Sequence, residues 1–143
     1  MPLLPIILTI CCGIAVALQG QFMGAMSERM GTLEAVFVTY VSGGIIISLV
    51  LAFMRGGNLQ AWRNVPSYML ITGILGLIIV GTISYVVPRL GLVTGFTILL
   101  VSQFTLAALI DHFGLFGATV RPLDPMKISG MGVTLFGLWL LVR

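Results

Sequence analysis

The sequence predicts an all-α integral membrane protein with five transmembrane helices in a single domain, residues 1–143. Two observations carry this prediction. The composition is 59% hydrophobic and 8% charged, whereas a water-soluble domain carries about 25% charged residues. The apolar residues are also gathered into long runs joined by connectors too short to fold alone. The helices are expected at about residues 2–25, 33–54, 67–88, 91–111 and 127–142.

The lengths of these segments match a bilayer. The first four reach the roughly 17–25 residues that an α-helix needs to cross the hydrocarbon core. The fifth is shorter, and the aliphatic stem of Lys127 extends it by snorkelling. The first segment lacks a basic start and a small-residue cleavage site, so we expect a retained helix rather than a signal peptide.

The charged and metal-binding residues exclude several classes of function. The net charge of +3 comes from basic residues that stand singly at segment ends, a pattern typical of interface anchors and not of nucleic-acid binding. Cys11 and Cys12 are adjacent on one helix and point about 100° apart, which disfavours a disulfide. With His112 as the single histidine and no acid pair within a span, we expect no metal, no cofactor and no enzymatic activity.

The basic residues leave the orientation in the membrane nearly undecided. One face collects Arg55, Arg63, Arg121 and Lys127, and the other collects Arg29, Arg89 and Arg143, which is four against three. Because Lys and Arg in short loops set the orientation, a difference of one sets it weakly. Either one charge or a partner protein still fixes a single orientation, or the chain inserts both ways and forms an antiparallel dimer. The second alternative makes the chain half of an inverted-repeat transporter, with substrate at the repeat interface.

Small residues mark a packing face on the first helix. Gly13, Ala17, Gly20 and Gly24 fall within an arc of about 60°. Gly20 and Gly24 form a GxxxG pair, which allows another backbone to approach closely. We expect this stripe to lie against another helix, in the same chain or in a second copy.

Three glutamines are the most informative polar residues within the spans. Gln19 and Gln21 lie on nearly opposite sides of the first helix, and Gln103 follows Ser102 near the middle of the fourth. An unpaired amide in hydrocarbon costs several kcal/mol, so each must face protein or a wet cavity. Each therefore either joins helices or contacts a substrate. The aromatic residues that could share a substrate site are Phe22, Tyr40 and Tyr85.

Carboxylates lie at the ends of the spans. Glu34 falls in the first turn of the second helix, where the helix dipole favours an acid. Asp111 falls at the C-terminal end of the fourth helix, where the dipole disfavours an acid, so it needs a partner. A structural pair with His112, Arg121 or Lys127 is one explanation, and proton coupling is the other.

The third helix is expected to stop at a proline turn. The sequence there is Pro88-Arg89-Leu90-Gly91. Proline disfavours a helical conformation at Val87, and Gly91 can adopt the left-handed conformation. We therefore expect a tight reversal, with Arg89 as an interface anchor.

In this order the residues resemble the YdcZ-type family of the drug/metabolite transporter superfamily, over nearly the whole chain. The motifs are Gly73-x-x-Gly76, the Pro88-Arg89-Leu90-Gly91 turn, Gln103, the run Asp111-His112-Phe113-Gly114, and Gly130 and Gly137 in the last helix. Gln19 also falls where the family typically has glutamine. Met23 and Ser102 depart from the family's usual asparagine and glycine.

The resemblance implies a five-helix, multi-pass protein of the inner membrane that acts as half of a transporter. It implies assembly as a homodimer or with a paired homologue. The small multidrug resistance exporters of the same superfamily use a glutamate in the middle of helix one. This chain has no such residue, so their proton-exchange mechanism is not implied here.

Two functions remain as alternatives. The first is an exporter of small organic metabolites or drugs that works by alternating access, and a neutral or amphipathic cargo fits the lack of a charged ligand. Its substrate-binding candidates are Gln103, Gln19, Gln21, Tyr85, Tyr40 and Ser102, with structural or coupling roles for Asp111, His112, Arg89, Gly20 and Gly24. The second is a non-transporting subunit that docks a larger membrane partner through glycine-rich helix faces.

Overall fold

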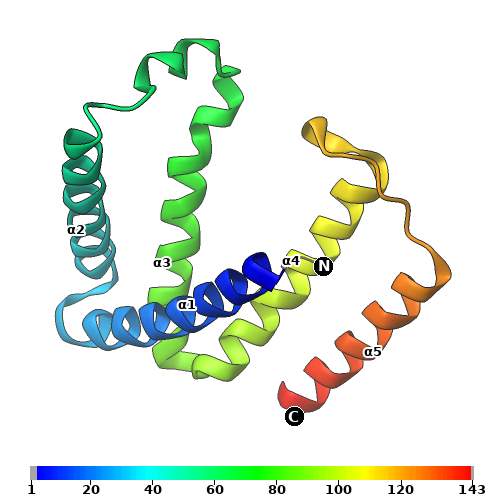
Figure 1. Cartoon of the computed structure of the whole chain (residues 1–143). Helices are drawn as coiled ribbons and strands as arrows, with labels where there is room; N and C mark the ends of the chain where they lie inside the picture. The colour runs from blue at the N-terminus through cyan, green and yellow to red at the C-terminus, as the bar shows by residue number, and fades with distance from the viewer. Residues whose placement is uncertain (1–2, 143) are drawn as a thin grey trace. The chain divides into compact units, whose positions relative to one another are not determined.

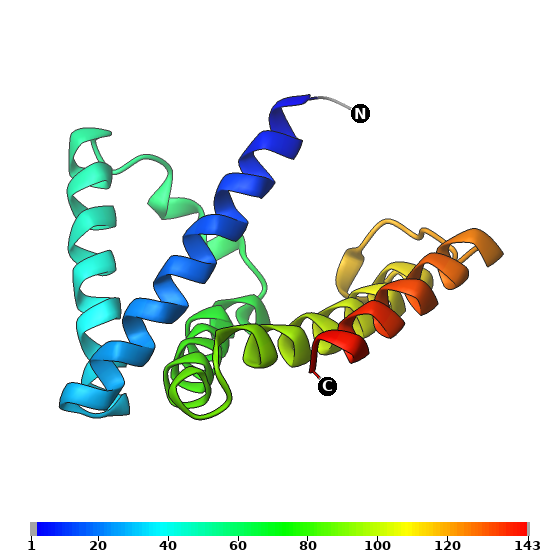
Figure 2. The same ribbon diagram turned by 90° about the horizontal axis from the view of Figure 1, so that it is seen from below.

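The computed structural model describes residues 3–142, whose regular secondary structure is all helical, and forms two compact units, Met1–Arg89 and Leu90–Arg143. The expected helix start at Pro2 and the C-terminal Arg143 lie outside the described residues. The elements, seen in Figures 1 and 2, are α1 (Leu3–Met30), α2 (Thr32–Phe53), η1 (Leu59–Asn64), η2 (Ser67–Ile71), α3 (Thr72–Leu90), α4 (Leu92–Phe113), η3 (Leu115–Gly117) and α5 (Pro125–Val142).

The helices confirm the all-α membrane fold. Four apolar segments are long enough to cross a membrane, namely Leu3–Met30, Thr32–Phe53, Ser67–Leu90 and Leu92–Phe113, and α5 is a shorter apolar helix. The single-domain assignment stays a prediction.

Helix α1 is longer than expected. It runs to Met30, because Ser27, Glu28 and Arg29 permit a helix and the first break comes at Gly31, with φ 104°. At 1.5 Å per residue its 28 residues span about 42 Å, more than the roughly 30 Å of the hydrocarbon core. The polar end of α1 therefore projects beyond the apolar layer or the helix tilts.

The core of the first unit lies where three helices converge near the Gly31 turn. Its buried side chains are Met23 from α1, Ala35 and Val36 from α2, and Ser84 and Val87 from α3. The Ser84 hydroxyl donates a hydrogen bond to the Met23 carbonyl at 3.3 Å, which satisfies a buried polar group across two helices. Most other large apolar side chains of the described residues are exposed, as expected for helices that face lipid or a second chain.

The glycine stripe of α1 divides into a packed half and an open half. Gly20 and Gly24 are buried, and a Cβ added at Gly24 would lie 2.9 Å from Val87 Cγ1 of α3. Such a Cβ at Gly13 would meet nothing within 4 Å. The C-terminal half of the stripe thus lets α3 approach, while the N-terminal half stays free.

The third helix differs from expectation at both ends. Its first turn, Ser67–Ile71, is a 3-10 helix, and α3 then continues through Pro88 to Leu90. The expectation that Pro88 ends the helix is wrong, because in the last turn a proline removes only one intrahelical hydrogen bond. The break falls at Gly91, whose φ of 81° and ψ of 159° differ from the expected left-handed conformation.

The second unit is an antiparallel pair of helices, α4 and α5, which lie side by side. Helix α4 ends at Gly114, which takes the left-handed conformation with φ 62° and ψ 34°. Helix α5 begins at Pro125, two residues before the expected start. Asp124 precedes it, and its carboxylate accepts a hydrogen bond from the Lys127 backbone N–H at 2.7 Å, so Asp124 is the N-cap and Pro125 the first helical residue.

Candidate functional site

The first candidate feature is a groove between α1 and α2 with a volume of about 550 Å³. Its lining is mostly apolar and consists of Ala15, Leu18, Gln19, Phe22, Met23, Met26, Val38, Thr39 and Ser42. The hydroxyls of Thr39 and Ser42 donate to carbonyls of their own helix, at 2.9 Å and 3.1 Å. The Gln19 amide makes no hydrogen bond to any of residues 3–142, which leaves it as the free polar group of the groove.

The groove lies at a depth that suits a transporter site. Gln19 is about 24 Å along the axis from the start of α1 and about 17 Å from its end, at 1.5 Å per residue. Its amide therefore falls well inside a hydrocarbon core of about 30 Å. Gln19 and Phe22 are both expected at a substrate site from the sequence, and the structure brings the two into one groove.

The other candidates of the first unit lie elsewhere. Gln21 is exposed and is not part of the groove lining. Tyr40 points its hydroxyl at Gly76 on α3, where the absence of a side chain makes room for it. Tyr85 is covered on one ring face by the Arg89 guanidinium, with 3.5 Å between Cζ and the ring centroid. Arg89 also donates to the Tyr85 carbonyl at 2.6 Å, so this pair forms a cation–π cap at the end of α3.

A polar hollow lies beside that cap. It is lined by Ser27, Glu28, Gly31, Thr32, Pro88 and Arg89, all from the ends of α1, α2 and α3. The hydroxyls of Ser27 and Thr32 share a hydrogen bond of 2.8 Å across the Gly31 turn. Because these residues stand at helix ends, the hollow belongs to the membrane–water interface and not to the mid-membrane region.

Gln103 occupies the middle of α4. It lies about 16 Å along the axis from either end of that helix, so its amide falls near the bilayer midplane. The side chain is exposed and makes no hydrogen bond to another described residue. Ser102 beside it has its hydroxyl engaged by the carbonyls of Leu99 and Ile98, at 2.8 Å and 3.2 Å, so Ser102 offers less to a ligand than Gln103 does.

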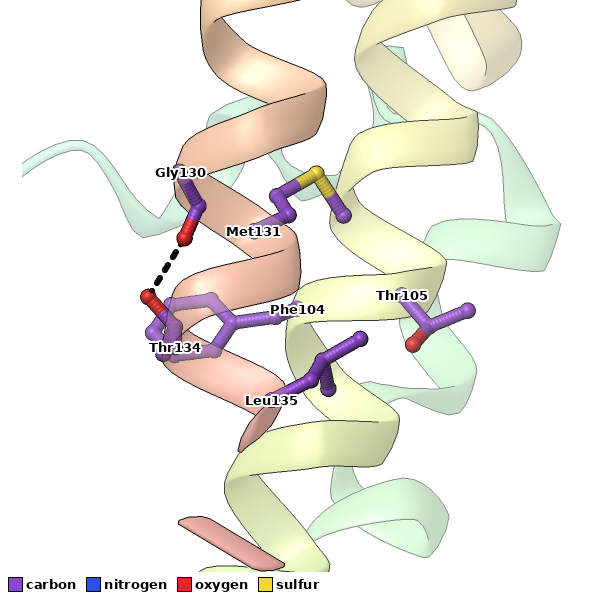
Figure 3. Close-up of a pocket in the computed structure, with 6 residues that line it drawn as sticks. All are labelled: Phe104, Thr105, Gly130, Met131, Thr134 and Leu135. Atoms are coloured by element: carbon purple, nitrogen blue, oxygen red, sulfur yellow. Dashed lines mark hydrogen bonds between the residues drawn. The ribbon is translucent and has the colours of Figure 1, made fainter. Parts of the chain in front are cut away.

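A second groove separates α4 from α5 (Figure 3). It is lined by Phe104, Thr105, Gly130, Met131, Thr134 and Leu135. Figure 3 shows Phe104 and Met131 reaching into the space between the two helices. Thr105 and Thr134 donate to carbonyls of their own helices, both at 2.9 Å, so their polar atoms are already satisfied and the groove is apolar in character. This groove is not among the sites expected from the sequence.

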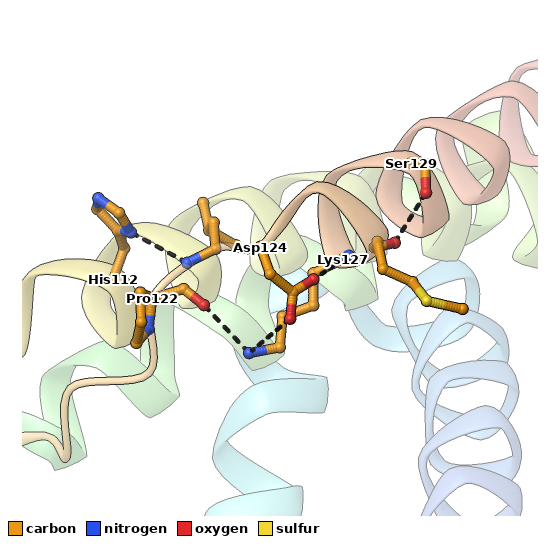
Figure 4. A network of polar contacts seen from close by, with 7 residues as sticks. His112, Pro122, Asp124, Lys127 and Ser129 are labelled. Atoms are coloured by element: carbon orange, nitrogen blue, oxygen red, sulfur yellow. Dashed lines mark hydrogen bonds and ion pairs between the residues drawn. The ribbon is translucent and has the colours of Figure 1, made fainter.

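The connector between α4 and α5 folds back onto the end of α4. The Arg121 backbone N–H donates to the Asp111 carbonyl at 2.8 Å, and the Leu123 backbone N–H donates to His112 Nδ1 at 3.1 Å. Lys127 Nζ donates to the Pro122 carbonyl at 3.1 Å and lies 3.9 Å from the Asp124 carboxylate (Figure 4). The end of the helical pair is therefore closed by one backbone hydrogen bond, two hydrogen bonds between side chains and backbone, and one ion pair.

The expected side-chain pair of Asp111 is not formed. The single ion pair among residues 3–142 joins Lys127 to Asp124. The structure instead ties the backbone of Asp111 to Arg121 and leaves both of their side chains without an ion pair. Asp124 is not among the residues singled out from the sequence, although an acid followed by proline at the start of an apolar run is a recognisable helix N-terminus.

The comparison with protein families agrees with a helical membrane protein. The family model DMT_YdcZ, described as "Putative inner membrane exporter, YdcZ", matches residues 4–140. No curated protein and no solved structure matches the chain. The chain therefore belongs to the YdcZ family of exporters, multi-pass proteins of the inner membrane.

Proposed function

We propose that this exporter carries small neutral or amphipathic organic molecules by alternating access, as an antiparallel dimer. The observation that carries the proposal is the pair of amides at mid-membrane depth, Gln19 and Gln103, that have no hydrogen-bond partner among residues 3–142. An amide left unpaired in hydrocarbon costs several kcal/mol, so water, a substrate or a second chain must satisfy each of them.

Gln19 is the proposed substrate contact of the first unit. The groove around it has a volume of about 550 Å³, within the roughly 300–1,000 Å³ of ligand pockets. Apolar walls with one free amide suit an organic molecule that needs a single oriented hydrogen bond. Phe22 adds an aromatic surface to the same groove.

Gln103 is the proposed substrate contact of the second unit. Sites in secondary transporters concentrate near the bilayer midplane, and Gln103 lies about midway along α4. The spans contain no acid at this depth. A charged cargo would therefore find no side chain of opposite charge at this depth. This favours a neutral or amphipathic molecule over a strongly charged one.

The dimer is proposed from the small core and the balanced charges. Within residues 3–142 the buried hydrophobic side chains are Met23, Ala35, Val36 and Val87, few for a five-helix protein. A four-to-three split of basic residues permits both orientations. Two copies in opposite orientations give the inverted symmetry on which alternating access is built.

The test is transport by the purified protein in proteoliposomes. A panel of uncharged, zwitterionic and cationic fluorescent organic compounds is loaded, and efflux is compared with empty liposomes. We expect Gln103→Leu and Gln19→Leu to reduce efflux of the transported compound by at least tenfold with helix content unchanged, because leucine keeps the volume and removes the amide. Gln60→Leu, an exposed amide in η1 outside the spans, is the matched control. Normal transport by Gln103→Leu means that the residue only packs helices, and its assignment to the site is then wrong.

A docking subunit is the second candidate. It is favoured by exposed glycines at which an added Cβ would meet nothing within 4 Å, among them Gly43, Gly44, Gly73 and Gly137. Such faces allow close approach of another helix. If the protein alone transports no compound of the panel but co-purifies in fixed stoichiometry with a second membrane protein, this function replaces the first.

A further inference from the structure

We propose that the end of the α4–α5 pair holds one phospholipid with a zwitterionic, primary-amine headgroup, of the phosphatidylethanolamine type. The site has a polar mouth and an apolar furrow. The mouth is lined by Asp111, Arg121 and Lys127, and the furrow is the α4–α5 groove of Figure 3. Phe104 and Met131 line both hollows, so the mouth and the furrow are neighbours along the α4–α5 pair.

The backbone of the connector sets the mouth in place. The bonds from Arg121 N–H to the Asp111 carbonyl and from Leu123 N–H to His112 Nδ1 hold the connector against the end of α4. The backbone therefore brings Asp111 and Arg121, two of the three charged residues of the mouth, to the same end of the helical pair.

The charges of the mouth complement a zwitterion. Lys127 is already engaged, since it lies 3.9 Å from the Asp124 carboxylate and donates to the Pro122 carbonyl. The charges left unpaired are one guanidinium, Arg121, and one carboxylate, Asp111, which make no ion pair with each other or with another of residues 3–142. A phosphate satisfies the guanidinium, and an ammonium satisfies the carboxylate at a helix end whose dipole disfavours a lone acid. An anionic headgroup would meet the guanidinium but would be repelled by the carboxylate.

The dimensions and character of the furrow suit an acyl chain. Asp111 and Pro125 lie at adjoining ends of α4 and α5, at the level of lipid headgroups. From Lys127 of the mouth to Leu135 of the furrow, the two hollows together extend about 12 Å along α5, close to the roughly 15 Å of one leaflet's hydrocarbon. The hydroxyls of Thr105 and Thr134 are satisfied within their own helices. Gly130 offers no side chain, and an added Cβ there would meet nothing within 4 Å, so the furrow is open.

The experiment is native mass spectrometry of the purified protein with an equimolar mixture of phosphatidylethanolamine, phosphatidylcholine and phosphatidylglycerol that carry identical acyl chains. Phosphatidylcholine keeps both charges but has no N–H to donate to Asp111, and phosphatidylglycerol has no cation. We expect the ethanolamine lipid to be retained about fivefold more than either of the others, the range of an exposed, charge-assisted contact.

Variants assign the preference to the named residues. Asp111→Asn should lower retention of the ethanolamine lipid to that of the choline lipid, and Asp111→Glu should preserve the preference. Arg121→Gln and Gly130→Leu should lower retention of all three lipids, by removing the phosphate contact and by filling the furrow. Glu28→Gln and Arg63→Gln, exposed charges of the first unit, should change nothing. Equal retention of the three lipids, a preference for phosphatidylglycerol, or an unchanged preference in a folded Asp111→Asn protein would overturn the proposal.

Discussion

Replacing Gly24 with alanine tests how closely α1 approaches α3. The new Cβ would lie 2.9 Å from Val87 Cγ1 and 3.4 Å from Pro88 Cδ, so the Val87 side chain or one of the two helices must shift. Overpacking of this kind costs about 1–3 kcal/mol, while alanine favours the helix over glycine by about 1 kcal/mol. The expected net change in the free energy of unfolding lies between zero and a loss of about 2 kcal/mol.

Gly13→Ala is the matched control, because an added Cβ there meets nothing within 4 Å. This variant should keep the helix-propensity gain and incur no overpacking cost. The two variants should therefore differ by about 1–3 kcal/mol. The difference is measured by titrating the detergent-solubilised protein with sodium dodecyl sulfate and following helix content by circular dichroism.

A double-mutant cycle identifies the atom responsible. Val87→Ala removes the Cγ1 that lies nearest to the added Cβ, so Gly24→Ala should cost less in the Val87→Ala background than in the native protein. Gly24→Leu is too large for either background and should unfold the first unit. If Gly24→Ala stabilises the protein as much as Gly13→Ala does, the close approach of α1 and α3 at this residue does not exist.

The orientation, the α4–α5 connector and the α5 cap give three further predictions. If the chain inserts in both orientations, C-terminal reporters for the two compartments should both be active in one strain. Two lysines added after Arg143 should leave only one reporter active. A single active reporter in the unmodified chain contradicts dual insertion. His112→Phe removes the acceptor of the Leu123 N–H and should lower the free energy of unfolding by about 1–2 kcal/mol in the same titration. An unchanged free energy of unfolding would mean that water replaces the bond. Asp124→Ala removes the cap on the Lys127 N–H and should cost about 1 kcal/mol, whereas Asp124→Ser should retain most of the stability; equal losses would show that the charge and not the cap matters.

The predictable part of the fold follows from local properties. The apolar runs and the short connectors predict the spans, because each span must satisfy its backbone internally and match the bilayer thickness. The ends of the helices were harder to predict. Helix α3 continues through Pro88, since a proline in the last turn removes a single hydrogen bond, and the start of α5 depends on the Asp124 cap, which the apolar pattern did not reveal.

The candidate site was only partly predictable. Mid-span amides are rare enough that the sequence singles out Gln19 and Gln103 without any structure. It does not reveal that Tyr40 packs against Gly76 or that Tyr85 lies beneath Arg89. Those arrangements depend on which faces of neighbouring helices meet, and sequence spacing alone does not report this.

The sequence by itself determined the class of this protein: a multi-pass, all-helical membrane exporter. The tertiary structure decided which small residues pack and which remain open, as Gly24 lies against Val87 while Gly13 is free. It also decided that Lys127 pairs with Asp124, which leaves Asp111 and Arg121 without an ion pair. The physical reason is the distance over which each kind of interaction acts. Insertion in the membrane depends on hydropathy summed along the chain, whereas pairing of side chains depends on distances of a few ångströms between residues that the fold brings together.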